Sequence, residues 1–97
     1  MHDRILNRWI RDFEREGYRI FGSKIIYGGK RHPKGEIDLL MQDKYLTVCE
    51  VKTSYRQFEH GLEQLNRLDE YFGNLEKYLI VGREIYYLYK FDKSKLD

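Results

Sequence analysis

The sequence predicts a mixed α/β fold in which helices flank a central sheet. Two segments, residues 3–16 and 55–72, repeat apolar residues at helical spacing. The other segments are short and rich in β-branched, leucine and aromatic residues, which is typical of strands. The expected order is a helix, three meandering strands, a second helix and two final strands. The 97 residues suit one domain, residues 1–97, near the lower size limit for a self-sufficient core.

The first helix is expected over residues 3–16, where Asp3 can cap its start and Gly17 can end it. An apolar stripe at helical spacing should pack on the sheet. Its members are Ile5, Leu6, Trp9, Ile10 and Phe13. We interpret the arginines on another face as a solvated surface paired with nearby acids, with phosphate contact as the alternative. These arginines are Arg4, Arg8, Arg11 and Arg15.

A flexible basic loop is expected over residues 28–35, after a first strand within residues 18–27. Glycines in this loop would let backbone amides approach a phosphate closely, and its cations would attract one. We therefore predict nucleic-acid contacts from Lys30, Arg31 and Lys34.

The next two strands are expected over residues 35–40 and 46–52. If residues 43–45 form the turn between them, Asp38 falls opposite Glu50. A slip of one residue in the pairing would move these side chains to different faces.

Alternation of side chains along a strand would place Glu36 beside Asp38 on one face, and Lys52 beside Glu50. Three carboxylates and an ammonium group would then meet at the middle of the sheet. Buried charges are costly unless they pair or bind a metal ion. The alternative is a half-buried hairpin with a Glu–Lys ion pair on its solvent face.

Such a cluster suits phosphodiester hydrolysis. Two carboxylates and one backbone carbonyl suffice for Mg²⁺, which prefers oxygen ligands and keeps several waters. Lys52 could activate a water molecule or neutralise charge that develops on a phosphate.

The second helix, expected over residues 55–72, would begin beside this cluster because it follows Lys52 closely. Its N-terminal amides favour a phosphate, and Arg56 in the first turn could help to bind it. Gln64 is a weaker site candidate, with a solvated helix face as the alternative. The final strands are expected over residues 78–81 and 85–91, and their tyrosines should cover a core edge or form a subunit contact.

The spacing of Asp38, Glu50, Val51 and Lys52 resembles the motif of the PD-(D/E)xK nuclease superfamily, which has the restriction-endonuclease-like fold. The chain is also similar to archaeal Holliday-junction resolvases and to small uncharacterised proteins with the same GEIDL and EVK motifs. The likeness covers about residues 3–81. It implies that Asp38, Glu50 and the Val51 carbonyl bind Mg²⁺, or Mn²⁺ in its place, and that Lys52 is the catalytic lysine.

Two positions depart from the superfamily pattern. Ile37 stands where the motif has a proline. Many resolvase-like members place a glutamate near the start of the first helix, where this chain has Leu6. The residues that could replace that glutamate are Asp3, Asn7, Glu14 and Glu36.

Composition narrows the remaining possibilities. The net charge of +2 does not by itself indicate nucleic-acid binding, so the case depends on where the charges lie. The single cysteine, Cys49, cannot form an internal disulfide and is expected to be a buried thiol. No apolar run is long enough to span a membrane and no signal peptide is evident, so we expect a soluble, cytoplasmic protein.

The sequence therefore predicts a Mg²⁺-dependent nuclease that hydrolyses DNA phosphodiesters, as a structure-selective, resolvase-like endonuclease. RNA is an open alternative substrate. We expect no small-molecule cofactor and no membrane partner, and a homodimer would match the two-fold symmetry of a junction. The alternative function is a nucleic-acid-binding or assembly module that keeps the fold without the chemistry.

Overall fold

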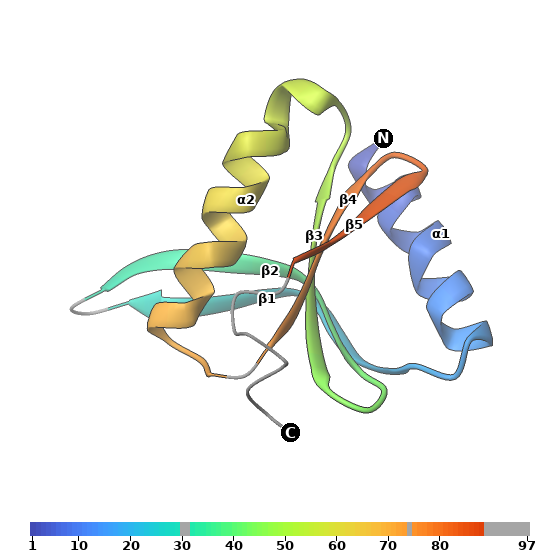
Figure 1. The fold of residues 1–97 in the computed structure, drawn as a ribbon, viewed down its shortest axis with the longest axis horizontal. Coiled ribbons are helices and arrows are strands. Elements are labelled where there is room, and N and C mark those ends of the chain that lie inside the picture. Colours follow the sequence, from blue (N-terminus) through green and yellow to red (C-terminus); the bar gives the residue numbers. More distant parts are fainter. Residues whose placement is uncertain (30–31, 74, 89–97) are drawn as a thin grey trace.

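Two helices cover opposite faces of a five-stranded mixed sheet in the computed structural model (Figure 1). The structure describes residues 1–29, 32–73 and 75–88. The strands lie in chain order, β1-β2-β3-β4-β5, with β3 parallel to β4 and the other neighbours antiparallel. This arrangement confirms the predicted mixed α/β class. The elements are α1 (His2–Arg15), β1 (Arg19–Gly29), β2 (His32–Gln42), β3 (Leu46–Lys52), the 3₁₀ helix η1 (Tyr55–Gln57), α2 (Phe58–Arg67), the 3₁₀ helix η2 (Leu68–Glu70), β4 (Glu76–Val81) and β5 (Glu84–Leu88).

The helices differ from the prediction mainly at their ends. Helix α1 begins one residue early, with Met1 rather than Asp3 at its N-cap position. The second helix is not continuous over residues 55–72, because a 3₁₀ turn precedes α2 and another follows it. In the described ranges, no helix has both the length and the apolar composition that crossing a bilayer requires.

The predicted loop over residues 28–35 is mostly strand. Gly28 and Gly29 have positive φ angles of 88° and 113°, which glycine adopts without strain, and they continue β1. Gly29 pairs with His32, so β2 begins well before residue 35. Lys30 and Arg31 lie outside the described residues, as does the part of the predicted last strand beyond Leu88.

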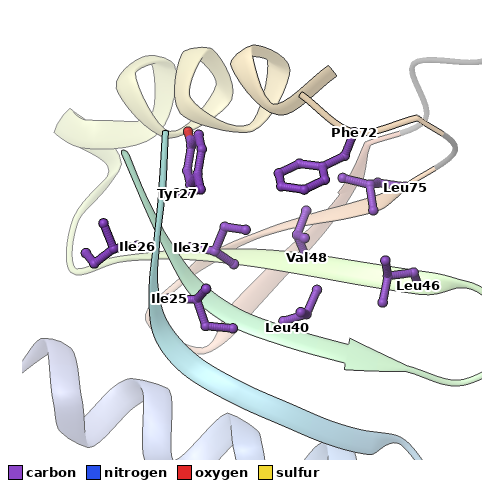
Figure 2. A pocket seen from close by; sticks show the side chains of 9 residues that line it. All are labelled: Ile25, Ile26, Tyr27, Ile37, Leu40, Leu46, Val48, Phe72 and Leu75. Carbon is purple, nitrogen blue, oxygen red and sulfur yellow. The ribbon is translucent and has the colours of Figure 1, made fainter. Parts of the chain in front are cut away.

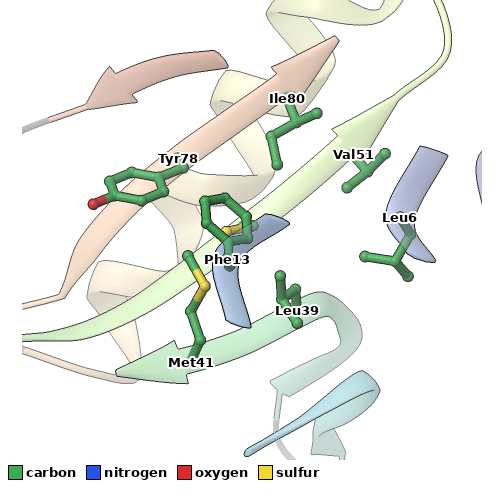
Figure 3. Close-up of a cluster of buried hydrophobic side chains, with 8 residues drawn as sticks. Leu6, Phe13, Leu39, Met41, Val51, Tyr78 and Ile80 are labelled. Atoms are coloured by element: carbon green, nitrogen blue, oxygen red, sulfur yellow. The ribbon is translucent and has the colours of Figure 1, made fainter. Parts of the chain in front are cut away.

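The core on one face of the sheet lies under α1 (Figure 3). Leu6 and Phe13 of the helix pack against a cluster of strand residues. Cys49 belongs to this cluster, and burial raises the pKa of its thiol well above the usual range. The prediction of a buried thiol is therefore confirmed. The strand members of the cluster are Leu39, Met41, Cys49, Val51, Tyr78 and Ile80.

The core on the other face lies under α2. Gly61 faces the sheet so closely that an added Cβ would lie 2.6 Å from Leu79 Cδ1 and 3.4 Å from Lys52 Cγ. The absence of a side chain at this position therefore allows α2 to pack directly against β3 and β4. The buried apolar residues of this core are Ile37, Val48, Leu65, Leu68, Leu75, Leu79 and Val81.

The β1–β2 ribbon changes face at Asp38. Ile37 belongs to the core under α2, whereas Leu39 belongs to the core under α1, although regular alternation would put both on one face. Lys24 has a positive φ of 53° in the adjacent strand. Simple alternation, on which the expectation for Glu36 and Asp38 is based, is therefore broken between Ile37 and Leu39. Glu36 is exposed and Asp38 is buried.

A second charged pair is buried under α2 and η2. The Lys77 side chain on β4 is fully buried, and its Nζ donates to Asp69 Oδ2 at 2.6 Å. Asn66 Oδ1 lies 3.5 Å from the same Nζ. Asp69 and Asn66 thus compensate a cation that has lost contact with water.

Candidate functional site

The hairpin of β2 and β3 has the predicted register. Residues 43–45 form the turn, Gln42 pairs with Leu46, and the ladder continues to Leu39 opposite Cys49. One further step in this register places Asp38 opposite Glu50. Beyond the ladder, the backbone N–H of Val51 donates to Asp38 Oδ2 at 2.8 Å. A carboxylate thus takes a hydrogen bond at the point where the two strands separate.

Asp38 and Glu50 form a buried pair of acids. Each residue is 4% exposed, and their side chains are hydrogen-bonded to each other. Burial, followed by the Asp38 carboxylate, raises the pKa of Glu50 to about 9, while the charge of Lys52 acts in the opposite direction. Glu50 therefore keeps its proton at neutral pH and donates it to Asp38.

His2 is a site residue that sequence reasoning missed. Its Nε2 lies 3.2 Å from Asp38 Oδ2, so the first turn of α1 contacts the acidic pair. Asp3 is engaged elsewhere, with its Oδ1 2.9 Å from Lys24 Nζ. The hydrogen bond from Lys24 lowers the pKa of the Asp3 carboxyl. Asp3 in turn raises the pKa of Lys24, with smaller contributions from Glu36 and Asp38.

The first helix supplies no carboxylate at the position of the resolvase glutamate. Leu6, at that position, is buried in the core under α1. Asn7 and Glu14 are exposed. Of the proposed replacements on this helix, Asp3 pairs with Lys24, whose pKa is also raised by Asp38.

Lys52 and Glu36 both lie near the buried pair, but they differ in their exposure to solvent. Lys52 is half-buried, with its stem against Gly61 of α2, and its charge reaches Glu50. Glu36 is exposed and makes the weakest of the contributions that raise the Glu50 pKa. Asp38, Glu50 and Lys52 therefore come together, and Glu36 lies at the margin.

The residues predicted to bind nucleic acid are dispersed. Lys34 is exposed on β2 near the tip of the β1–β2 hairpin, and Arg56 is exposed in η1. Gln64 is not on a solvated face, because its Oε1 is buried and has no hydrogen-bond partner within the described ranges. It lies one helical turn after Gly61, which packs against Lys52. An acceptor without a donor is thus left in the interior, close to the acidic strand.

The donor set fits Mg²⁺. In residues 1–29, 32–73 and 75–88, no three His, Cys, Asp or Glu side chains gather to hold a metal ion. The available donors are instead two hard carboxylates, Asp38 and Glu50, and the backbone carbonyl of Val51. Mg²⁺ accepts such a small set because it retains several waters. A divalent cation would also relieve the cost of two buried acids that share one proton.

A separate apolar pocket of about 250 Å³ lies between the β1–β2 hairpin, β3 and the segment before β4 (Figure 2). The described residues that line it include no acid and no base, and Tyr27 is the one among them with a hydroxyl group. This pocket has no group that could hold a cation or a phosphate. Its lining residues are Ile25, Ile26, Tyr27, Ile37, Leu40, Leu46, Val48, Phe72 and Leu75.

Comparison with known proteins gives a family and nothing finer. No curated protein and no solved structure matches the chain. One family model matches residues 8–92, which include the acidic pair and Lys52 and exclude His2. The chain therefore belongs to the uncharacterised protein family UPF0102.

Proposed function

We propose that this protein is a Mg²⁺-dependent nuclease that hydrolyses DNA phosphodiester bonds. The observation that carries the proposal is the buried Asp38–Glu50 pair with Lys52 beside it. A fold retains two adjacent buried acids at a cost in stability, and such costs concentrate at functional sites. The motif resemblance to the PD-(D/E)xK superfamily supports the same conclusion and a restriction-endonuclease-like core.

Asp38, Glu50 and the Val51 carbonyl would hold the cation. When bound, Mg²⁺ supplies positive charge to the scissile phosphate and lowers the pKa of a water molecule. Asp38 is held in place by the Val51 N–H and by His2, so its carboxylate is oriented before any ligand arrives. Glu50 must give up its proton for the cation, which makes metal binding favourable at higher pH.

Lys52 would act on the phosphate side of the site. Its half-buried stem lies next to Gly61, and its charge acts on Glu50. There it can orient the attacking water or stabilise charge that develops on the phosphate in the transition state. His2 acts through Asp38 and is a positioning residue.

Selectivity for DNA structure rather than sequence is the finer part of the proposal. The apolar faces of α1 and α2 are both packed on the sheet. Direct base reading commonly uses a helix inserted into the major groove. Recognition through the backbone and shape of a junction or flap therefore suits this architecture better.

The test is a cleavage panel in Mg²⁺ and Mn²⁺ with labelled single strand, duplex, flap, four-way junction and RNA. We expect the wild type to cut at least one DNA substrate, and Asp38→Asn and Lys52→Met to lose at least about 10²-fold in rate. Asp43→Asn, an exposed acid in the β2–β3 turn, is the matched control and should cut normally. Equal cleavage by the wild type and both site variants would overturn the assignment.

A nucleic-acid-binding module without chemistry is the second candidate. It is favoured by Leu6, which is buried where resolvase-like members have a glutamate. Calorimetry separates the two functions, because a nuclease should bind Mg²⁺ or Mn²⁺ with release of the Glu50 proton. DNA binding without any metal binding would favour the module.

A further inference from the structure

A basic pocket lies beside the catalytic strand, between the start of α1 and the β4–β5 turn. Figure 1 shows the N-terminal end of α1 next to this turn. The pocket has a volume of about 290 Å³, and three of its lining side chains are arginines. Among the described residues that line it, none is acidic. They are Met1, Arg4, Ile5, Arg8, Thr53, Gly82 and Arg83.

Hydrogen bonds fix this pocket to the candidate active site. Trp9 of α1 donates its indole N–H to the Gly82 carbonyl at 2.8 Å. The N–H of Gly82 donates to the Lys52 carbonyl at 3.1 Å. Gly82 has a φ of +60°, a conformation that favours glycine, so the turn that carries Arg83 has a defined shape. The backbone of Lys52 therefore helps to position one wall of the pocket, and Thr53 extends it.

The arginines of the pocket have no competing carboxylates. Nowhere in the described part of the chain does an acid pair with Arg4, Arg8 or Arg83. Their acidic neighbours in sequence are engaged elsewhere. Asp3 pairs with Lys24, and Glu84 accepts hydrogen bonds from the Tyr55 and Tyr86 hydroxyls.

We propose that Arg4, Arg8 and Arg83 bind a backbone phosphate of the DNA strand, next to the phosphate that the active site cleaves. This inference rests on the proposed function. It replaces the interpretation of Arg4 and Arg8 as a solvated surface paired with acids. Guanidinium groups recognise phosphate oxygens through paired N–H donors, and three arginines line this one pocket.

This pocket would also offset the electrostatic repulsion between the acidic site and DNA. The carboxylates of Asp38 and Glu36 repel an approaching polyanion. The pocket includes Thr53, the residue that follows Lys52. Its three arginines attract the same strand and set its direction across the site. The start of α1 contributes to both the acidic pair and the pocket, since His2 contacts Asp38 while Arg4 and Arg8 line the pocket.

The test is fluorescence anisotropy with a short fluorescein-labelled DNA duplex in EDTA, where cleavage cannot occur. The variant Arg4→Gln/Arg8→Gln/Arg83→Gln should bind at least tenfold more weakly than the wild type. Its plot of log K against log[salt] should be shallower by about 1, because the loss of one phosphate contact removes about 0.9 from the slope. Arg15→Gln, at the other end of α1 and paired with Asp12, is the matched control and should bind within twofold of the wild type.

A triple variant that binds like the wild type would overturn the proposal, as would equal weakening by Arg15→Gln. Circular dichroism and urea midpoints establish that the variants are folded, and Arg4→Lys/Arg8→Lys/Arg83→Lys should recover part of the affinity because it restores charge without the paired donors. Failure of the proposed function gives a different pattern. In that case the arginine variants weaken binding, but the wild type cleaves no substrate in Mg²⁺ or Mn²⁺.

Discussion

Two charged clusters are buried on neighbouring strands, and they are built in opposite ways. On β4, the Lys77 ammonium meets the Asp69 carboxylate at 2.6 Å, so unlike charges compensate each other. On β3, Glu50 lies against Asp38, so two acidic groups are buried together and share a hydrogen bond. Burial removes water from both clusters. Only in the first does an internal ion pair compensate for the lost hydration.

The difference separates a structural pair from a candidate functional one. Removal of one partner from the Lys77–Asp69 pair leaves a buried charge without compensation. Removal of a carboxyl group from the Asp38–Glu50 pair instead relieves repulsion and burial of a charge. Stability and activity should therefore respond in opposite directions at the two clusters.

The largest expected effect is on the structural pair. Asp69→Ala should lower the free energy of unfolding by about 3–5 kcal/mol, because it leaves the Lys77 cation buried without its partner. Urea denaturation at neutral pH measures this change. The control is Asp12→Ala, which removes the solvent-exposed pair with Arg15 and should cost less than about 1 kcal/mol. Equal losses in the two variants would show that Lys77 does not depend on Asp69.

The opposite sign is expected at Glu50. Glu50→Gln should raise the free energy of unfolding of the metal-free protein by about 1–2 kcal/mol at pH 8, and should abolish cleavage. Folding raises the pKa of Glu50 to about 9, so between its ordinary value and pH 9 the folded state holds a proton that the unfolded state releases. Wild-type stability must then fall as pH rises through this range. Thermal melts at pH 5 and pH 8 should show the variant's advantage only at the higher pH.

A smaller effect is expected from the cation. Mg²⁺ at a few times its Kd should raise the free energy of unfolding of the wild type by about 1 kcal/mol, because the ion binds only the folded state. The same addition should leave Glu50→Gln nearly unchanged, and it should stabilise Asp69→Ala as much as the wild type. A thermal-shift titration at pH 8 measures all three. Stabilisation of Glu50→Gln by an equal amount would mean that the ion binds elsewhere.

The smallest effect on stability is expected for His2. His2→Ala should change the free energy of unfolding by no more than about 0.5 kcal/mol, since the side chain is partly exposed at a helix end. It should nevertheless weaken Mg²⁺ binding or cleavage about 10-fold, because Asp38 loses a partner that orients it. Metal titration and the separate values of kcat and KM would reveal this. A variant with unchanged metal affinity and rate would remove His2 from the site.

Local pattern was enough to predict the hairpin that carries the acids. A polar turn and two apolar strands determine the register, and the register brings Asp38 towards Glu50. The bend at Asp38 was not predictable in the same way, because it depends on the positive φ of Lys24 and on which helix covers each half of the ribbon.

The remaining differences arise from tertiary contacts. His2 comes to the site because α1 lies across the sheet, and no spacing in the sequence links it to Asp38. Lys77 follows Glu76 in the sequence, and two adjacent charged residues are typical of an exposed surface. Its burial depends on η2, which brings Asp69 over the strand. The helix over residues 55–72 is interrupted where 3₁₀ turns fit the chain to the sheet.

The order of the strands has a consequence for how the chain reaches this structure. Every strand pairs with the strand that precedes it, and only the link from β3 to β4 passes through a helix. The entropy lost in closing the hairpin turns is therefore small, whereas the parallel pairing of β3 with β4 must close the longer segment that contains α2. The pairing of β2 with β3 closes only a short turn, so the two acids should meet before β4 docks beside β3.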